Sequence, residues 1–433
     1  MEAASYTGAP SRRAGCDPPM SDYVHRTLEC GLEFAAELLP RRRTVAIHFQ
    51  MLAGAAHDPA DKLGLAHLIE QTLDKGTEHH DARGLADAID RLGVRRDSWV
   101  GRESFGFRTL SLPEFLPQVV RLHGEMLRSP TFPDRACRTA VELACQELDG
   151  LQDEPIELLR KVQARQAYGP RLGRHPLGER ETLAAMGPDD IRSQWASTFS
   201  AGRLQVAVAG PVDIEATTDL LEQVFSGFGP SAPAGREPFE TTFSPVTTHV
   251  PKQLQQQYIS ICWPGAPATD PDFPVERVIL GILAGGMSGR LFTEVREKLG
   301  LVYWVGAWHE HPRAAGMIHL GASTSPDRCE QTLGVLMREV DRLADDLHSD
   351  ELERSIVGII ARTHTRGEIT LARAAELADD LFYYGRPVPT DQKLDQVSRV
   401  GVKQVGDYLE RHRRDRLSIV TLGPHPKESE RGK

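Results

Sequence analysis

Membrane-spanning segments, a secretory leader and an excess of positive charge are all lacking in this 433-residue sequence. No run approaches the roughly 18 consecutive apolar residues that a membrane-spanning helix needs. The N-terminal segment has no apolar core of the kind found in a signal peptide. Its 51 Lys and Arg residues are outnumbered by 61 Asp and Glu, for a formal net charge of −10. We therefore expect a cytoplasmic protein without membrane contact and, since nucleic-acid binding normally needs a basic surface, without a nucleic-acid partner.

Cysteine is also scarce. The six cysteines are scattered and include no Cys-x-x-Cys pair, which argues against a disulfide framework and favours free thiols in a reducing compartment. What the sequence does have is the composition of a soluble globular protein, with 40% hydrophobic and 26% charged residues. Its length favours two or more domains.

Composition and periodicity divide the chain into four segments. Residues 1–22 are rich in Gly, Pro, Ser and Ala and predict a disordered lead-in, in which Met20 is a plausible alternative start. Residues 23–226 alternate between strand and helix patterns and predict an N-terminal domain. Residues 227–246 are rich in Pro and Gly without any period and predict a linker. Residues 247–427 predict a C-terminal domain, in which four helical patterns precede the last strand.

A nine-residue segment recurs near the end of each predicted domain. RLQVAVAGP at residues 203–211 matches RLSIVTLGP at residues 416–424, and each follows a helical pattern. Because the order of the surrounding elements also agrees, duplication explains the match better than chance. Strands grouped together and helices grouped together indicate an α+β fold. We expect two homologous domains, each a mainly antiparallel sheet with helices packed on one face.

Three polar residues share one face of the helix predicted for residues 62–74. His67, Glu70 and Gln71 stand at i, i+3 and i+4, a spacing that projects them from the same side. An imidazole at i and a second ligand at i+4 can hold one zinc ion, while a carboxylate at i+3 can polarise bound water. On periodicity alone, however, a His and a Glu on an amphipathic helix more often serve packing and solvation.

The surroundings of these residues resemble the N-terminal signature of the insulinase/pitrilysin family of zinc peptidases, which includes mitochondrial processing peptidase. GLAHLIEQTLDKGT at residues 64–77 is similar to the zinc-binding helix of that family, and residues 26–55 resemble its first hairpin. GGMSGRLFTEVREKLGLVY at residues 285–303 resembles a second, separate signature. The resemblance covers residues 22–425, almost the whole chain, and implies a zinc peptidase fold.

In this family, zinc is held by both histidines of His-x-x-Glu-His and by a glutamate about 76 residues further on. The resemblance therefore implies that His67 and Glu147 are zinc ligands and that Glu70 is the general base, which takes a proton from zinc-bound water. Without the resemblance, Glu147 would be interpreted as a solvated helix residue. Gln71 stands where the second histidine is expected. An amide oxygen is a much poorer zinc ligand than an imidazole nitrogen, so we expect weak zinc binding.

Two further positions depart from the family pattern. Asp97-Ser98 replaces an Asn-Ala step on the strand that faces the zinc, and Ala140 replaces an acidic residue upstream of the third ligand. His79 and His80 could compensate for the lost ligand, but they follow the turn that ends the helix and should point elsewhere. The resemblance thus implies a catalytic half that is degraded at three places.

The C-terminal half keeps its own functional pair. Arg296 and Tyr303 match the Arg and Tyr that bind the substrate backbone in the family and support the reacting carbonyl. The alternative is an arginine on the charged helix face at residues 294–298 and a tyrosine that packs on a strand.

Three functions fit this pattern. The leading hypothesis is a non-catalytic or weakly catalytic subunit that binds peptides or unfolded polypeptides and forms a homo- or heterodimer with a related chain carrying an intact zinc motif. Alternatively, the chain is an active zinc metalloendopeptidase with His67, Gln71 and Glu147 as ligands, or a purely structural subunit of a larger assembly. A binding module unrelated to peptidases would hold these three residues far apart.

Overall fold

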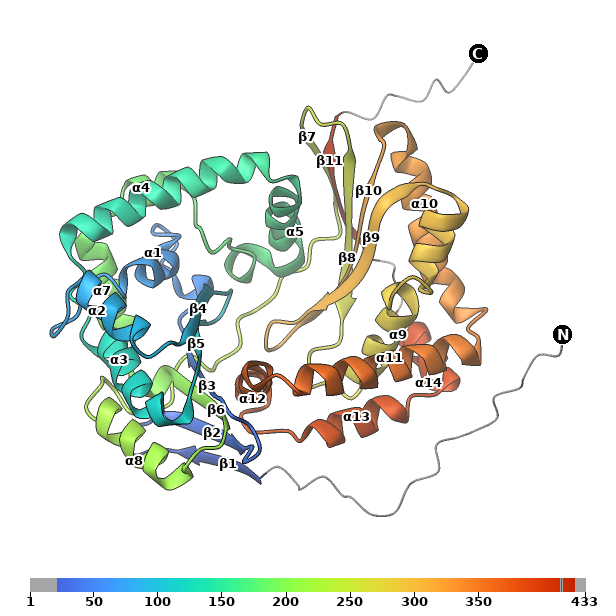
Figure 1. Cartoon of the computed structure of the whole chain (residues 1–433). Coiled ribbons are helices and arrows are strands. Elements are labelled where there is room, and N and C mark those ends of the chain that lie inside the picture. Colours follow the sequence, from blue (N-terminus) through green and yellow to red (C-terminus); the bar gives the residue numbers. More distant parts are fainter. Residues whose placement is uncertain (1–21, 413, 415, 425–433) are drawn as a thin grey trace, which may run out of the picture.

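Two sheets, one from each half of the chain, form the frame of the molecule (Figure 1). The computed structural model describes residues 22–412, 414 and 416–424, so the predicted lead-in lies outside the described residues apart from residue 22, and so does the predicted end of the second domain. Within the described ranges, none of the helices is both long enough and apolar enough to span a membrane.

The N-terminal half contains six strands and eight α-helices among its described residues. The strands are β1 (Asp22–Thr27), β2 (Glu33–Leu38), β3 (Val45–Met51), β4 (Arg95–Val100), β5 (Phe105–Ser111) and β6 (Leu204–Gly210). The helices are α1 (Leu65–Thr72), α2 (Ala82–Asp90), α3 (Leu116–Arg128), α4 (Asp134–Gly150), α5 (Pro155–Leu172), α6 (Arg180–Ala184), α7 (Pro188–Thr198) and α8 (Ile214–Phe225).

The C-terminal half follows residues 227–246, which form neither helix nor strand. Its strands are β7 (Thr247–Pro251), β8 (Gln257–Gly265), β9 (Val302–Glu310), β10 (Gly316–Thr324) and β11 (Ser418–Gly423). Its helices are α9 (Phe273–Ala284), the π-helix η5 (Leu291–Lys298), α10 (Cys329–Asp341), α11 (Ser349–Gly367), α12 (Thr370–Tyr384), α13 (Thr390–Ser398) and α14 (Val402–Arg411). Five α-helices therefore stand where four patterns were predicted, and only two residues separate α11 from α12.

The two sheets share one topology. The strand order is β1-β2-β6-β3-β5-β4 in the first sheet and β7-β11-β8-β10-β9 in the second. Without β1, the two sheets have the same strand order and the same strand directions. β2 runs parallel to β6 in the first sheet, and β7 runs parallel to β11 in the second. All other neighbouring strands are antiparallel. The repeated nine-residue segments fall on the equivalent strands β6 and β11. The predicted α+β fold with two mainly antiparallel sheets is confirmed, and duplication accounts for it.

Each sheet also carries a helix from the other half on its second face (Figure 1). α5 packs against β8 and β11, while α12 packs against β2, β3 and β6. The α12 contact is made largely by small side chains, among them Ala46, Ala207, Ala209 and Ala374, which let helix and sheet approach closely. This exchange adds a layer to the predicted architecture. Helical periodicity shows that a helix has an apolar face, but it does not show which sheet that face covers.

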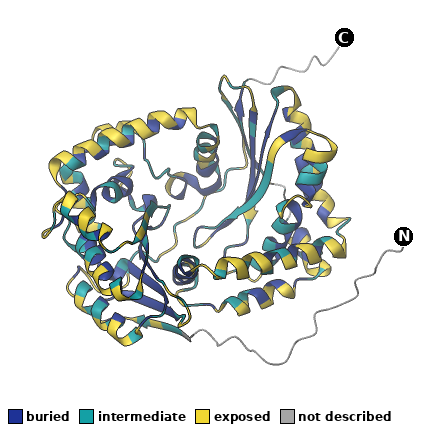
Figure 2. Cartoon of the chain, in the orientation of Figure 1, coloured by how far each residue is buried: buried dark blue, intermediate teal, exposed yellow. Residues whose placement is uncertain are grey.

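Strand alternation separates the two faces of the first sheet. On β3, Val45, Ile47, Phe49 and Met51 enter the N-terminal core, whereas Ala46 faces α12. Figure 2 shows α12 and these strands as buried, while the outward faces of α4 and α11 are exposed. The halves are thus joined through buried layers, which fixes the frame that carries α1 and η5.

Several histidines are buried as neutral rings. Burial lowers the pKa of His48 and His123 to about 3 and that of His319 to about 4. Neither ring nitrogen of His48 has a hydrogen-bond partner, and its ring lies edge-on to that of Trp99 with 4.5 Å between centroids. Such groups make the fold sensitive to acid, because the unfolded chain binds protons that the folded chain excludes.

His48→Phe is expected to reduce this sensitivity. At His48 the unfolded chain takes up a proton near pH 6.5 and the folded chain only near pH 3, so the stabilisation is complete above pH 6.5 and is lost as the pH falls toward 3. The loss is about 1.4 kcal/mol per pH unit. Urea unfolding measures the free energy of unfolding at pH 7 and at pH 5. The drop between these two pH values should be about 2 kcal/mol smaller in the variant than in the natural protein. Equal pH dependence would contradict a neutral, buried His48.

Candidate metal centre and Arg/Tyr pair

A buried carboxylate positions the start of α1. Asp58 accepts hydrogen bonds from the backbone N–H groups of Gly64 (2.8 Å) and Ala66 (2.9 Å), which would otherwise be unpaired in the first turn. Burial raises the pKa of Asp58 to about 7, although these two N–H groups act in the opposite direction. Gly64 has a φ of +107°, and a Cβ there would collide with the side chain of Leu183. The helix therefore begins at a fixed point.

The apolar face of α1 sets the direction of its polar face. Leu65, Leu68 and Ile69 are buried in the N-terminal core. α1 packs against α4 and β4. Of the i, i+3, i+4 set, His67 contacts Glu147 on α4 and Glu70 contacts Ser98 on β4.

His67 and Glu147 are brought together from α1 and α4. His67 Nε2 lies 3.4 Å from Glu147 Oε2, and the His67 side chain is only 11% exposed. This Nε2 atom is buried and makes no hydrogen bond. Two ligands that bind one zinc ion at tetrahedral angles lie about 3.4 Å apart, so the pair fits a shared metal ion.

Glu70 and Gln71 are bonded to each other. Gln71 Nε2 donates to Glu70 Oε2 at 2.6 Å, and Ser98 Oγ on β4 donates to Glu70 Oε1 at 2.5 Å. Both carboxylate oxygens of Glu70 therefore have a neutral donor. The amide of Gln71 is directed toward Glu70, the residue that corresponds to the general base. A histidine at position 71 would instead direct a ring nitrogen toward the metal position.

The donor set does not fit the three-ligand zinc site that the sequence resemblance implies. His67 and Glu147 supply one imidazole and one carboxylate, and Gln71 adds only an amide oxygen. Among the described residues, no group of three or more His, Cys, Asp and Glu side chains could hold a metal ion. Catalytic zinc sites use three protein ligands of the N, S or carboxylate type. At this site the described residues supply two ligands of that type, His67 and Glu147.

His80 and Asp97 each have a charged partner outside the candidate metal centre. His80 Nδ1 is 3.0 Å from Glu125 on α3, and Asp97 forms an ion pair with Arg108 on β5. His175 is a neighbour of His67 that the sequence did not indicate. Burial lowers the pKa of His175 to about 4, and His67 is close enough to contribute to this shift. His175 lies in the loop after α5, far from α1 in sequence, so no local pattern indicates it.

The Arg/Tyr pair is assembled in the C-terminal half. The Arg296 guanidinium carbon lies 4.9 Å from the centroid of the Phe292 ring and 5.7 Å from that of the Tyr303 ring. Arg296 is exposed, and Tyr303 is 76% exposed, so it does not pack on its strand as the alternative interpretation required. The π-helix η5 carries Arg296, and π-helical turns are frequent at functional sites.

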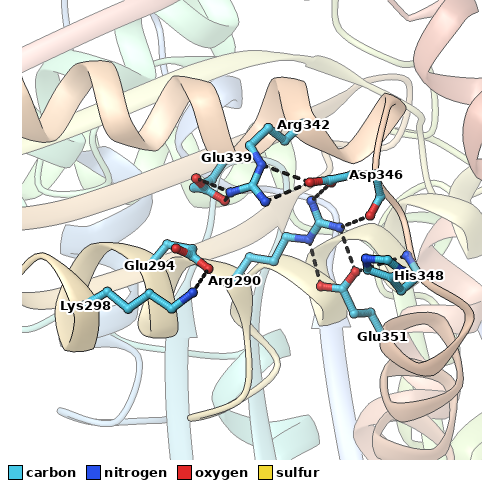
Figure 3. Close-up of polar contacts among 8 residues, drawn as sticks. All are labelled: Arg290, Glu294, Lys298, Glu339, Arg342, Asp346, His348 and Glu351. Carbon is cyan, nitrogen blue, oxygen red and sulfur yellow. Dashed lines mark hydrogen bonds and ion pairs between the residues drawn. The ribbon is translucent and has the colours of Figure 1, made fainter.

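Partly buried ion pairs anchor the start of η5 (Figure 3). Arg290, only 7% exposed, pairs with Asp346 and with Glu351, each at 2.6 Å. Burial alone would lower the pKa of Arg290, but its hydrogen bonds to Glu351 and Asp346 raise it. Arg342 also contacts Asp346, at 2.7 Å. The network ties η5 to the start of α11 and so fixes the helix that presents Arg296.

Large apolar side chains are exposed close to the pair in sequence. They are Met287 (76% exposed), Leu299 (47%) and Trp304 (43%). Exposed apolar side chains mark contact surfaces for other molecules where they form one contiguous patch.

Two family models match the chain. Residues 33–179, which contain α1 and α4, match insulinase (peptidase family M16). Residues 185–357, which contain Arg296 and Tyr303, match the peptidase M16 inactive domain.

Bacterial relatives match almost the full length. An uncharacterized zinc protease of Bacillus subtilis, YmxG, is 23% identical over 401 residues, which are 92% of this chain and 97% of that protein. An uncharacterized zinc protease of Streptomyces coelicolor is 25% identical over 407 residues, 92% of this chain and 89% of that protein. A Helicobacter pylori protein named non-peptidase homolog YmxG is 23% identical over 380 residues, 84% of this chain and 85% of that protein.

Two solved structures have the same fold. A peptidase M16 inactive domain from Pseudomonas fluorescens superposes with a TM-score of 0.85 at 20% identity, covering 93% of this chain and 98% of that chain. A protease from Helicobacter pylori superposes with a TM-score of 0.84 at 16% identity, covering 94% of this chain and 100% of that chain. At these low sequence identities, the superpositions show that the folds are alike.

Proposed function

The chain belongs to the insulinase/pitrilysin family of peptidases, and we propose that it is a subunit with little or no hydrolytic activity of its own. In this proposal it binds peptides through Arg296 and Tyr303 and pairs with a related chain that carries an intact zinc motif. The sites fall in residues 23–226 and 247–427, which we propose as the two domains. Such a subunit would complete the active site of its partner.

One observation carries the proposal: the amide of Gln71 donates to Glu70 at the position where a third zinc ligand is needed. With two suitable ligands, the affinity for zinc should be low, and without bound zinc there is no activated water for Glu70 to deprotonate. The name of the Helicobacter pylori relative, a non-peptidase homolog, is consistent with this interpretation.

The Arg/Tyr pair and its surroundings support the binding role. Arg296 and Tyr303 are exposed side by side and can donate to the carbonyl groups of an extended peptide. The exposed Met287, Leu299 and Trp304 supply apolar area of the kind that binds peptides or a partner subunit. A purely structural subunit would not need these groups at its surface.

A second candidate function is an active zinc metalloendopeptidase with Gln71 as an unusual third ligand. The distance of 3.4 Å between His67 and Glu147 favours it, because a ligand pair at metal-binding distance has been kept. The buried Nε2 atom without a hydrogen bond points the same way. The zinc measurement described at the end of the Discussion separates the two candidates.

Arg296→Ala is expected to weaken the binding of an unstructured fluorescent peptide by at least about tenfold, because the guanidinium that holds the peptide carbonyls is lost. Fluorescence anisotropy with the full chain measures the dissociation constant. Lys298→Ala is the matched control, since Lys298 is on the same π-helix and pairs with Glu294 at 2.7 Å. If the natural protein binds no peptide, the structural-subunit hypothesis replaces the proposal. If both variants bind as tightly as the natural protein, Arg296 has no part in peptide binding and that part of the proposal fails.

A further inference from the structure

Three arginines line a cavity of about 580 Å³ in the C-terminal half. Arg277 comes from α9, Arg362 and Arg366 come from α11, and Ala307 of β9 also lines the cavity. The other lining residues are Gly, Ala, Leu, Ile and one Thr, so no acidic side chain lines it. We call this cavity the arginine pocket.

The three guanidinium groups have no hydrogen-bond or ion-pair partner among the described residues. Arg362 and Arg366 are exposed, whereas Arg277 is half-buried. Burial lowers the pKa of Arg277, against the opposing effect of the more distant Glu376. That carboxylate is already engaged by Arg373 and Lys393. A cation withdrawn from water without a partner destabilises the free protein, which is the pattern expected of a binding group and not of a structural one.

A second acidic group lies on the other side of Arg366. Burial raises the pKa of Asp379 to about 6, and Arg366 acts against this rise. Arg277 and Arg366 also line a neighbouring cavity that contains Glu376, Asp379 and Asp380, but neither arginine forms an ion pair with any of these carboxylates. The three guanidinium groups are therefore not engaged in ion pairs, although these carboxylates offset part of the charge of Arg277 and Arg366.

The pocket occupies the place that corresponds to the candidate metal centre in the duplicated topology. In the N-terminal half, α1 packs against α4 and against the edge strand β4. In the C-terminal half, α9 packs against α11 and against the edge strand β9. The first set of elements holds metal-binding residue types, and the second holds arginines.

The open edge of β9 indicates the form of the ligand. β9 is the last strand of its sheet, and no strand among the described residues pairs with its other edge. An extended peptide can pair with such an edge, and every second side chain then points to the same face. Ala307 of β9 lines the arginine pocket, so side chains of that peptide would reach it.

We propose that the arginine pocket binds side-chain carboxylates of an acidic peptide lying along β9. Guanidinium groups bind carboxylates through paired, charge-assisted hydrogen bonds, and three such groups without internal partners can hold more than one carboxylate. The proposal rests on the proposed function of peptide binding and adds a substrate class to it, polypeptides with clustered Asp and Glu.

The test uses the full chain and two labelled peptides of equal length, one with Glu at alternate positions and one with Gln in their place. Anisotropy should show the Glu peptide binding at least about tenfold more tightly to the natural protein. Arg277→Met and Arg362→Gln should abolish this preference. Arg135→Gln should preserve it, because Arg135 is an exposed arginine on α4, outside the arginine pocket.

Urea unfolding of Arg277→Met separates binding from a structural role. Removal of a half-buried cation without a partner should leave the unfolding midpoint unchanged or raise it, whereas loss of a structural contact would lower it. Equal binding of the two peptides, or a preference for the Glu peptide that persists in Arg277→Met, overturns the proposal that the arginine pocket binds carboxylates. The proposed peptide binding through Arg296 and Tyr303 is not affected by either result. If neither peptide binds, the proposed function fails together with it.

Discussion

Gln71→His is expected to tighten zinc binding on the order of a thousandfold, about 4 kcal/mol. The substitution adds an imidazole at i+4 from His67, on the same helix face, while Glu147 already lies 3.4 Å from His67 Nε2. The first two ligands are held by packed helices, so little ordering is needed when the third is added. Competition with a chromophoric chelator measures the zinc affinity of the variant and of the natural protein under the same conditions.

Gln71→Ala is the matched control for this change. If the amide oxygen contributes nothing to metal binding, Gln71→Ala and the natural protein should bind zinc with equal, low affinity. Combining Gln71→His with Glu147→Gln should return the affinity to that low level, because the carboxylate ligand is lost. A large loss of affinity in Gln71→Ala alone would show that Gln71 is a ligand.

Adding Glu70→Gln to the Gln71→His variant is expected to reduce peptide hydrolysis by about 10² to 10⁴ while zinc remains bound. Glu70 is held by Ser98 from β4 and stands at i+3 from His67, which places its carboxylate beside the metal position. A glutamine of the same size cannot accept the proton. The measurement is kcat/KM for a quenched fluorescent peptide, with zinc content determined on the same samples.

Glu142→Gln, in the same Gln71→His background, is the matched control, since Glu142 is an exposed glutamate on α4. It should leave both hydrolysis and zinc content unchanged. Hydrolysis that survives Glu70→Gln would contradict the role of Glu70 as the base. If the Gln71→His protein binds zinc but hydrolyses no peptide, the departures at Asp97-Ser98 or Ala140 also prevent catalysis.

The central strands and the duplication were predictable because they leave local signals, whereas β1, β2, β4 and β7 were not predicted from their patterns. β3, β5 and β6 alternate or are continuously apolar, and the recurrent nine-residue segment marks β6 and β11. The exchange of α5 and α12 between the halves was not predictable. Their apolar faces are visible in the sequence, but the sheet that each face covers is settled only by the assembled molecule.

The candidate site shows the same division. The common face of His67, Glu70 and Gln71 follows from helix geometry alone. Glu147 lies 80 residues after His67, and only the family resemblance related the two before the structure placed them 3.4 Å apart. The hydrogen bond from Ser98 to Glu70 depends on the register of the edge strand, and no pattern in the sequence reports it.

The arginine pocket was likewise hidden in the sequence. Arg277 and Arg362 are 85 residues apart, each on an ordinary amphipathic helix with charged neighbours. Only the packing of α9 against α11 shows that three arginines share one cavity without a carboxylate. The absence of partners is a property of the assembled fold.

The most direct test of the account is the zinc content of the natural protein after exhaustive dialysis, measured by mass spectrometry of the metal. The account predicts far less than one zinc ion per chain, because His67 and Glu147 are the only suitable ligands that the described residues bring together at this site. Zinc close to one ion per chain would contradict it, and loss of that zinc in Gln71→Ala would establish Gln71 as a working third ligand.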